Sequence, residues 1–419
     1  MDSFSHTSFQ EREKRLTDAI ALKKPDRVPV APLIAHYYPT RAAGISNKDA
    51  MLFYEQRYES MKNMTVRLDL DTAMSPLAFP PARFLENLGL TGFKWPGGLL
   101  RDDQPFQFSC DGTLKSTEYA EFITDPNGFT LKKIWPQIST TLAPLAELAL
   151  PPLYWLSNPY DLAFILPEIA AEPSILDLLK QLVALGEEFV RYRQATTKYL
   201  TEMREAGYPL AFGGVTLTAF DCVGDFLRGM RGAMTDMYRA PEKLLETIEM
   251  LTPASIQKGI ISAKNTGCSR VFIPLHWGAA GFMSNDQYAR FYWPCLNALI
   301  SGLLDAGLTP VPLFEGNYTP RLEFLKELPK GKVAGHFEVV DRRKAKEVLG
   351  DTMCFWGNVP SSLMTTGSPA EVRDDVKELI EIFGDNGGLI IDASVGLPDE
   401  TKPENLAAMV EAVMELGGY

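Results

Sequence analysis

The stretch "PVPLFEGNYTPRLEFLKELPKGKVAGHFEV", residues 310–339, contains the pattern that decides the fold. The apolar run 311–314 predicts a short strand that ends at Glu315. The run 333–336 predicts a second short strand that ends at His336, and a helical segment separates the two. Parallel strands need a crossover helix of this kind, so the stretch is typical of a βαβ unit.

The same alternation of short apolar strands and helices extends along the chain on both sides of this stretch. Strands that each follow a helix are expected at 209–216, 270–277, 309–316, 332–338, 352–358 and 388–394. Two further strands at 26–38 and 70–76 bring the number to about eight, which closes a (β/α)8 barrel. The first strand is not followed by GxGxxG, which weighs against a doubly wound nucleotide-binding fold.

The sequence therefore predicts an α/β protein with one TIM-barrel domain over residues 25–419 and two additions to it. Residues 1–24 are expected to form an N-terminal helical arm. Residues 76–135 are rich in glycine, proline and β-forming residues, which favours an irregular, hairpin-bearing insertion after the second strand.

The composition excludes several classes of function. The 419 residues carry a net charge of −12, which disfavours nucleic acid as a partner. No stretch reaches the roughly 18 to 20 apolar residues of a membrane helix, and the first residues lack a signal-peptide core. The five cysteines are scattered, odd in number and form no CxxC pair, so we expect a cytoplasmic protein without a disulfide framework.

Polar side chains stand at the predicted ends of the strands, where active sites of such barrels gather. In chain order they are His36, Asp71, Thr216, His276, Glu315, His336, Asn358 and Asp392. The chain has only four histidines, and three of them are in this set. Two interpretations remain open: each group is a hydrogen-bonded strand end, or His276, Glu315 and His336 bind zinc, which accepts imidazole and carboxylate ligands.

Six segments resemble the uroporphyrinogen decarboxylase superfamily, over about residues 20 to 416. They are "DRVPVAPLIAHYYPTRAAGIS", "KWPGG", "FLRGMRGAMTDMYRAPEKLLE", "HWGAAGFMSNDQYARFYWP", "GLTPVPLFEGNYTPRLEFL" and "GNVPSSLMTTGSPAEV". Within the superfamily, the sequence is most similar to the corrinoid-dependent methyltransferase branch, namely the methyltransferase I components of O-demethylases. The resemblance implies a zinc-dependent enzyme that moves a methyl group from a small methoxylated, aromatic compound to the Co(I) corrinoid of a partner protein.

Departures from related motifs select this branch. The decarboxylases carry an arginine pair in a motif like R-Q-A-G-R, whereas the corresponding stretch here is "IAHYYPTR", with only Arg41. Thiol-directed methyltransferases carry H-x-C, where this chain has "LFEGN". The E-x20-H portion of a zinc motif of O-demethylase methyltransferases matches Glu315 and His336, but Ile300 replaces its upstream glutamate. We expect His276 as the third ligand.

The chemistry of methyl transfer suggests roles for other strand-end residues, while the alternative, in which the aspartates are caps and the aromatic residues form the barrel core, stays open. His36, Tyr37 or Tyr38 would give a proton to the leaving phenolate, and Asp71 or Asp392 would orient a histidine. Asn358 would contact the substrate. Aromatic side chains would line a slot for a planar ring: Tyr37, Tyr38, Phe79, Trp95, Phe220, Trp277, Phe282 and Trp356.

Alternative functions remain open on the same fold. One is decarboxylation of a polycarboxylate, and another is a corrinoid-protein docking module without chemistry. The sequence has no D-x-H-x-x-G corrinoid motif, so the corrinoid is expected to come from the partner protein. A homodimer is expected from the resemblance alone.

Overall fold

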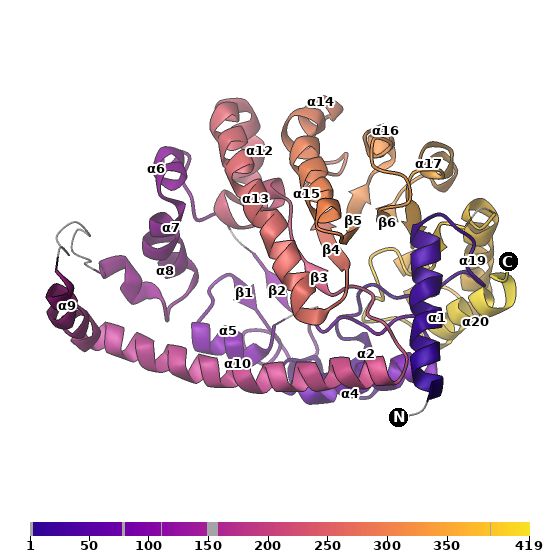
Figure 1. The fold of residues 1–419 in the computed structure, drawn as a ribbon, viewed down its shortest axis with the longest axis horizontal. Helices are drawn as coiled ribbons and strands as arrows, with labels where there is room; N and C mark the ends of the chain where they lie inside the picture. Colours follow the sequence, from indigo (N-terminus) through magenta and orange to yellow (C-terminus); the bar gives the residue numbers. More distant parts are fainter. Residues whose placement is uncertain (1–2, 78–79, 110, 149–157, 386) are drawn as a thin grey trace.

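The computed structural model describes residues 3–77, 80–109, 111–148, 158–385 and 387–419 (Figure 1). Its central sheet has six parallel strands in the order β3-β4-β5-β6-β7-β8. They are β3 (Gly214–Val215), β4 (Arg270–Leu275), β5 (Thr309–Asn317), β6 (Ala334–Val339), β7 (Cys354–Trp356) and β8 (Leu389–Ile390). Each strand therefore pairs with its neighbour in sequence, as in a barrel built from successive βαβ units.

Two short extended segments close this sheet into a barrel of eight parallel members. Val30 bridges Ile391 after β8, and Ala73 bridges Leu210 before β3, both in parallel. The two segments meet each other where Asp71 donates its backbone N–H to the Val30 carbonyl, 3.0 Å away. The (β/α)8 barrel predicted from the sequence is confirmed, including its first two strands.

Helices and short helical turns surround the barrel. Those outside the insertion are α1 (Ser3–Ile20), α2 (Tyr38–Ala42), α3 (Asn47–Leu52), α4 (Tyr54–Arg67), α11 (Ala219–Cys222), η4 (Val223–Leu227), α12 (Gly229–Arg239), α13 (Pro241–Thr266), α14 (Asn285–Gln287), η5 (Tyr288–Tyr292), α15 (Trp293–Asp305), η6 (Thr319–Arg321), α16 (Leu322–Leu325), α17 (Arg342–Leu349), α18 (Ser361–Thr365), α19 (Pro369–Phe383) and α20 (Pro403–Leu416). Local capping sets their starts: the Ser46 hydroxyl accepts the Asp49 N–H before α3, and Ser368 and Glu371 form a capping box before α19.

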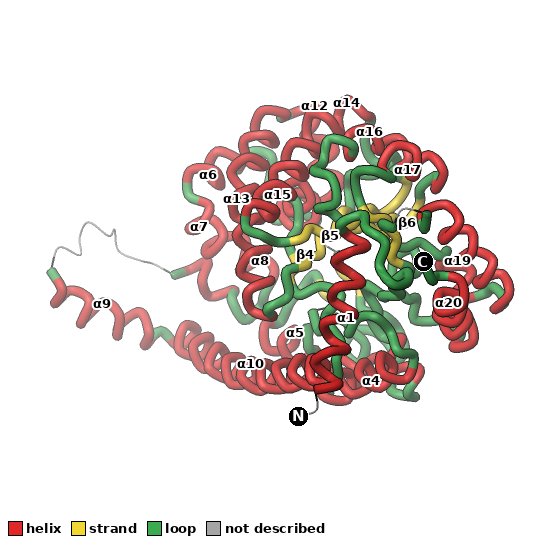
Figure 2. The backbone as a smooth tube through the Cα atoms, turned by 45° about the vertical axis from the view of Figure 1, so that its right-hand side comes forward, coloured by secondary structure: helices red, strands yellow, loops and turns green. Residues whose placement is uncertain are grey.

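A long insertion separates the second and third barrel strands. It contains α5 (Ala82–Leu88), β1 (Phe93–Lys94), β2 (Gln107–Phe108), α6 (Tyr119–Thr124), α7 (Pro126–Phe129), η1 (Thr130–Ile134), α8 (Trp135–Ile138), η2 (Ala143–Glu147), α9 (Pro159–Ala171) and α10 (Pro173–Glu205). β1 and β2 pair antiparallel as a hairpin. Figure 2 shows α9 and the first half of α10 reaching away from the barrel.

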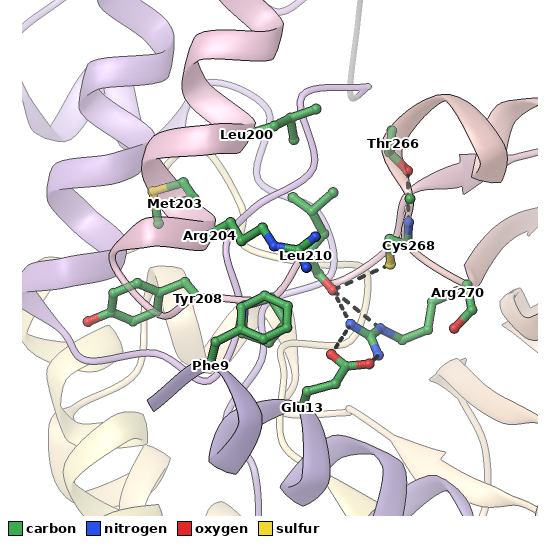
Figure 3. Close-up of a pocket in the computed structure, with 13 residues that line it drawn as sticks. Phe9, Glu13, Leu200, Met203, Arg204, Tyr208, Leu210, Thr266, Cys268 and Arg270 are labelled. Atoms are coloured by element: carbon green, nitrogen blue, oxygen red, sulfur yellow. Dashed lines mark hydrogen bonds and ion pairs between the residues drawn. The ribbon is translucent and has the colours of Figure 1, made fainter. Parts of the chain in front are cut away.

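The amino-terminal helix α1 covers one end of the barrel. Its Leu16 and Ile20 pack in one cluster with inward-facing residues of the strands, such as Leu33 and Phe212. A cavity of about 240 Å³ beside α1 is lined by Phe9, Glu13, Leu200, Met203, Arg204, Tyr208, Pro209, Leu210, Thr266, Gly267, Cys268, Ser269 and Arg270 (Figure 3). Arg270 is the first residue of β4, so this cavity lies at the amino-terminal end of the strands, opposite the end where active sites of such barrels lie.

None of the helices in the described ranges is both long and apolar enough to cross a membrane.

Candidate active site

His276 and Glu315 stand side by side at the carboxyl ends of neighbouring strands. Leu275, the last residue of β4, pairs in register with Phe314 of β5. Side chains alternate between the two faces of a strand, so the next residues of both strands, His276 and Glu315, point into the barrel at the same level. The distance from His276 Nε2 to Glu315 Oε1 is 3.7 Å.

His336 lies one side-chain layer deeper than this pair. Leu313 of β5 pairs with His336 of β6, and Glu315 is two residues further along β5. Two residues of a strand span about 6.6 Å, so the residue of β6 nearest to the level of Glu315 is Glu338. A shift of register after Phe314 bends the strand here, and Glu338 Oε2 accepts the Gly316 N–H at 2.6 Å.

Carboxylates surround the imidazole of His276. Its Nδ1 lies 2.7 Å from Asp225 Oδ2, and its Nε2 faces Glu315. Burial alone lowers the pKa of His276, but the hydrogen bond to Asp225 and the charges of Asp221, Asp225 and Glu315 outweigh it and raise the pKa to about 9. The ring is thus held in a strongly acidic environment at the open end of the barrel.

Asp221 and Asp225 come from the helix that follows β3. Asp221 is fully buried and accepts the Trp277 backbone N–H at 3.1 Å and the Tyr292 hydroxyl at 2.7 Å. Burial raises its pKa to about 6. Asp225 lies in the π-helical turn η4, a distortion that is frequent at functional sites. The sequence analysis missed both residues, although their spacing of four places them on one face of a helix.

Asp225 also binds Trp277, the residue after the histidine. Its Oδ1 accepts the indole N–H of Trp277 at 2.7 Å, while its Oδ2 binds His276. One carboxylate therefore fixes the orientation of two consecutive side chains at the end of β4. This is the arrangement of a carboxylate that orients a ligand or catalytic histidine through its second nitrogen.

Glu315 is a partly buried carboxylate. Burial raises its pKa, the charge of His276 opposes that rise, and the charges of Glu338 and Asp225 add to it. Glu315 thus faces one histidine and two further acids. The end of the barrel between β4 and β6 is rich in negative charge.

His336 and Asp392 form a second, fully buried histidine–carboxylate pair. His336 Nε2 lies 3.0 Å from Asp392 Oδ2, and neither side chain reaches solvent. Asp392 Oδ2 also accepts the Leu33 N–H at 2.8 Å, which ties β8 to the first barrel strand. Among the described residues, none is hydrogen-bonded to His336 Nδ1. Asp392 thus holds the ring of His336 and joins two strands as well.

The three expected zinc ligands are only partly brought together. Two atoms bound to one tetrahedral zinc lie roughly 3.3 Å apart, which is close to the 3.7 Å between His276 Nε2 and Glu315 Oε1. His336 lies deeper, and within the described ranges no three histidine, cysteine or acidic side chains are grouped closely enough to hold one ion. The spacing of His276 and Glu315 therefore suits two ligands of one metal ion, whereas His336 does not lie close enough to this pair to be the third ligand.

His36, Tyr37, Tyr38 and Trp95 lie near the hairpin of the insertion. His36 packs edge-on against Phe106 with ring centroids 5.5 Å apart, and burial and then the charge of Arg57 lower its pKa to about 4. The Tyr37 hydroxyl donates to the sulfur of Met51 at 3.0 Å. His36 is therefore neutral at pH 7, and the Tyr37 hydroxyl is held by Met51.

Tyr38 is buried at the start of α2, and Trp95 packs with the cluster around Tyr37. Asp71 is bound to Arg15 and Arg27. Asp71 thus serves ion pairing near the amino-terminal arm, away from the histidines.

Aromatic side chains flank His276. Trp277 and Phe282 meet edge-to-face with ring centroids 5.0 Å apart, and Phe282 is 42% exposed. Phe220 is fully buried behind them and packs against Tyr292 at 5.4 Å. Trp277 and Phe282 are therefore the predicted substrate-binding aromatics that the structure places beside the histidine at the open end.

Trp356 is the last residue of β7 and Asn358 lies two residues beyond the end of that strand. Trp356 is fully buried in the barrel interior, pairs in register with His336 and donates its indole N–H to the Ala31 carbonyl at 2.9 Å. Asn358 and Glu338 line a cavity of about 530 Å³ at the ends of β6 to β8. Phe79 lies outside the described residues.

Comparisons with known proteins agree with this architecture. Residues 168–416, more than half of the chain, match the family model for uroporphyrinogen decarboxylase (URO-D). A uroporphyrinogen decarboxylase from Syntrophotalea carbinolica is 25% identical over 233 residues, which cover 55% of this chain and 66% of that protein. The enzyme of the same name from Vibrio campbellii is 29% identical over 184 residues, which cover 43% and 50%.

The chain spans between half and two thirds of the length of these curated relatives. A solved structure described as a methyltransferase from Methanosarcina mazei superposes with a TM-score of 0.62 at 16% identity. That superposition covers 96% of this chain and 98% of the other, and it shows a shared fold. Given the match of the family model over the larger part of the barrel, the chain belongs to the uroporphyrinogen decarboxylase family.

Proposed function

We propose that the protein is a methyltransferase that removes the methyl group of a small methoxylated aromatic compound and passes it to the Co(I) corrinoid of a partner protein. The likeness to a solved structure named as a methyltransferase supports this branch of the family. So does the absence, in the sequence, of the arginine pair of the decarboxylases. The single observation that carries the proposal is the cluster of carboxylates at the open end of the barrel.

That end of the barrel presents carboxylates to an incoming molecule. Asp225 and Glu315 flank His276, and the charge of Glu338 acts on Glu315. A further negative charge placed among them costs several kcal/mol. Arg41, the arginine left from the decarboxylase motif, is paired with Glu400 at 2.9 Å. A neutral ether is therefore a better substrate for this surface than a polycarboxylate.

The reaction balances without an oxidant. The Co(I) of the corrinoid supplies the electron pair for the new bond to the methyl carbon, and the carbon–oxygen bond breaks. The phenolate leaves with the electron pair of that bond and takes up a proton. A group that stabilises negative charge at the ether oxygen lowers the barrier, because aryloxide is a poor leaving group. The chain's own residues bind the ring beside Trp277 and keep His276 in a fixed orientation.

Zinc is the group that we propose for this task, since it stabilises developing negative charge on oxygen as a Lewis acid. His276 and Glu315 would hold it, because their facing atoms are spaced as two ligands of one ion are. His336 stays the third ligand that the sequence predicts, since its Nδ1 lacks a hydrogen bond within the described part of the chain. Its ring lies one side-chain layer below the other two side chains, so it would have to approach them for all three to bind one ion. Asp225 and Asp392 would fix the orientations of the two histidines.

Metal analysis of purified variants tests this proposal. About one zinc per chain is expected in the wild type, with loss of the metal in His276→Ala, Glu315→Ala and His336→Ala. Asp236→Asn is the matched control, since Asp236 is a buried acid that binds Arg228 and the Tyr119 hydroxyl, away from His276. Retention of zinc in all three alanine variants would contradict the assignment of the ligands. Loss in Glu338→Gln with retention in His336→Ala would transfer the third position to Glu338.

A further inference from the structure

The cavity at the amino-terminal end of the barrel is built by three parts of the chain that lie far apart in the sequence (Figure 3). α1 contributes Phe9 and Glu13 to its lining. The last turn of α10 contributes Arg204, and β4 begins with Arg270. The volume of about 240 Å³ corresponds to roughly eight water molecules at 30 Å³ each. The space therefore suits a molecule with a single ring.

The cationic side chains of this cavity outnumber its acids. Arg204 and Arg270 line it, and Glu13 is the only acid of the lining. Both carboxylate oxygens of Glu13 are engaged, because they accept from the Arg270 guanidinium at 2.7 and 2.9 Å. The lining is thus left with one uncompensated positive charge, in a chain whose net charge is −12.

Arg204 carries that charge. Its guanidinium carbon lies 5.2 Å from the centre of the Phe9 ring, and Figure 3 shows the side chain extending from α10 toward Leu210. Among the described residues, no acid pairs with Arg204 and no oxygen accepts one of its side-chain N–H groups. The carboxyl end of α10 favours a cation at this position, but it leaves the five N–H donors of the guanidinium without an acceptor. Arg204 therefore offers the two parallel N–H groups that recognise a carboxylate.

Apolar side chains form the wall next to this guanidinium. They are Phe9, Leu200, Met203 and Leu210. An inorganic anion would leave this wall in contact with water, whereas a ring attached to a carboxylate covers it and packs against the Phe9 ring. Small-molecule sites combine apolar walls with a few polar groups in this way. Charge and shape therefore favour an anion with a small aromatic body.

We propose that this cavity is a binding site for a small aromatic monocarboxylate such as benzoate. The carboxylate accepts two hydrogen bonds from Arg204, and the ring packs against Phe9 and Leu210. The opposite end of the barrel has the reverse charge, because carboxylates flank His276 there. An aromatic acid is therefore bound at the amino-terminal end of the strands and repelled at the other, so the site is separate from the candidate active site.

Titration of 4-fluorobenzoate into the full-length protein, followed by fluorine NMR, tests the proposal. The expected dissociation constant is about 1 mM, as suits a ligand of about ten non-hydrogen atoms with one charged contact. Arg204→Gln should raise it roughly tenfold or more. Arg193→Gln is the matched control and should bind as the wild type does, because Arg193 is also an exposed arginine of α10 that forms no ion pair with a described residue.

Two competitors define the chemistry of the ligand. 4-Fluorobenzamide has the same shape without the charge and should bind roughly tenfold more weakly than the acid. Inorganic phosphate at the same concentration should not displace 4-fluorobenzoate, since it has no ring to cover the apolar wall. A benzamide that binds as tightly as the acid, or displacement by phosphate, would overturn the assignment of an aromatic carboxylate.

Cys268 reports where the ligand binds. Its side chain lines the cavity and is partly exposed, so 4-fluorobenzoate at about 10 mM, ten times the expected dissociation constant, should slow its alkylation by iodoacetamide. Mass spectrometry of peptides measures this rate for each cysteine separately. Absence of binding at that concentration, equal affinity in Arg204→Gln and the wild type, or an unchanged alkylation rate at Cys268 would each overturn the proposal.

Discussion

Replacing Asp225 by asparagine isolates the role of the carboxylate that orients His276 and Trp277. The side chain is almost fully buried and makes two hydrogen bonds of 2.7 Å, one to each neighbour. Hydrogen bonds to a charged group contribute about 1.5–3 kcal/mol each. Asparagine keeps one acceptor oxygen but carries no charge, so the variant loses about the free energy of one of these two hydrogen bonds. Its amide nitrogen cannot accept from His276 Nδ1–H.

The expected result is a 10- to 100-fold weaker affinity for zinc, as is typical when a carboxylate behind a metal-binding histidine is removed. Competition with a chromogenic chelator measures this directly and needs no substrate. Asp236→Asn is the matched control, because Asp236 is also buried and accepts from Arg228 and the Tyr119 hydroxyl, away from His276. That control should lose stability and keep its zinc affinity. Equal zinc affinity in Asp225→Asn and the wild type would refute the reasoning.

Three further predictions concern residues outside the histidine pair. Glu13→Gln leaves the buried Arg270 without its carboxylate partner. The free energy of unfolding measured in urea should fall by about 2–4 kcal/mol, while the zinc content stays unchanged. An unchanged urea midpoint would exclude a stabilising role for this ion pair. The pKa of His36 is about 4 when folded, against 6.5 when unfolded, so the unfolded chain binds the extra proton. The contribution of His36 to the free energy of unfolding is therefore fully present above pH 6.5, and up to about 3 kcal/mol of it is lost as the pH drops to 4. His36→Gln should reduce this dependence of stability on pH in urea titrations at several pH values. An unaltered dependence would contradict the prediction. Trp356→Phe should lower the melting temperature without changing KM. Trp277→Phe should raise KM with little change in the melting temperature. The reverse pattern would place Trp356 in the substrate site.

The barrel could be predicted from the sequence because its strands are short apolar runs separated by helices. That pattern is local, and it also revealed the first strand near Val30 and the second near Ala73, which pair through isolated bridges and single hydrogen bonds. Breaks within a helix, which depend on the backbone angles of a single residue, were harder to predict. The sequence predicts one helix over 45–68, but Phe53 leaves the helical conformation and divides it into α3 and α4.

The residue types of the site could be predicted from the sequence, but the level of each side chain along the barrel could not. Strand ends identified His276 and Glu315, which the structure places together. The register between β5 and β6 is set by pairing that the sequence does not encode in any motif, so the one-layer offset of His336 was not foreseen. Asp225 was missed because it comes from a helix and acts through a π-helical turn, whereas only strand ends were searched.

Transfer of a deuterated methyl group from neutral trideuteromethoxy-benzenes to cob(I)alamin, followed by mass spectrometry, distinguishes methyl transfer from decarboxylation most directly. Wild-type protein is expected to form labelled methylcobalamin and the corresponding phenol in equal amounts. Glu315→Ala should form neither, and Asp236→Asn should retain both. If the wild type transfers no label from any methoxylated donor and instead releases carbon dioxide from a polycarboxylate, the account of this site as a methyltransferase is contradicted.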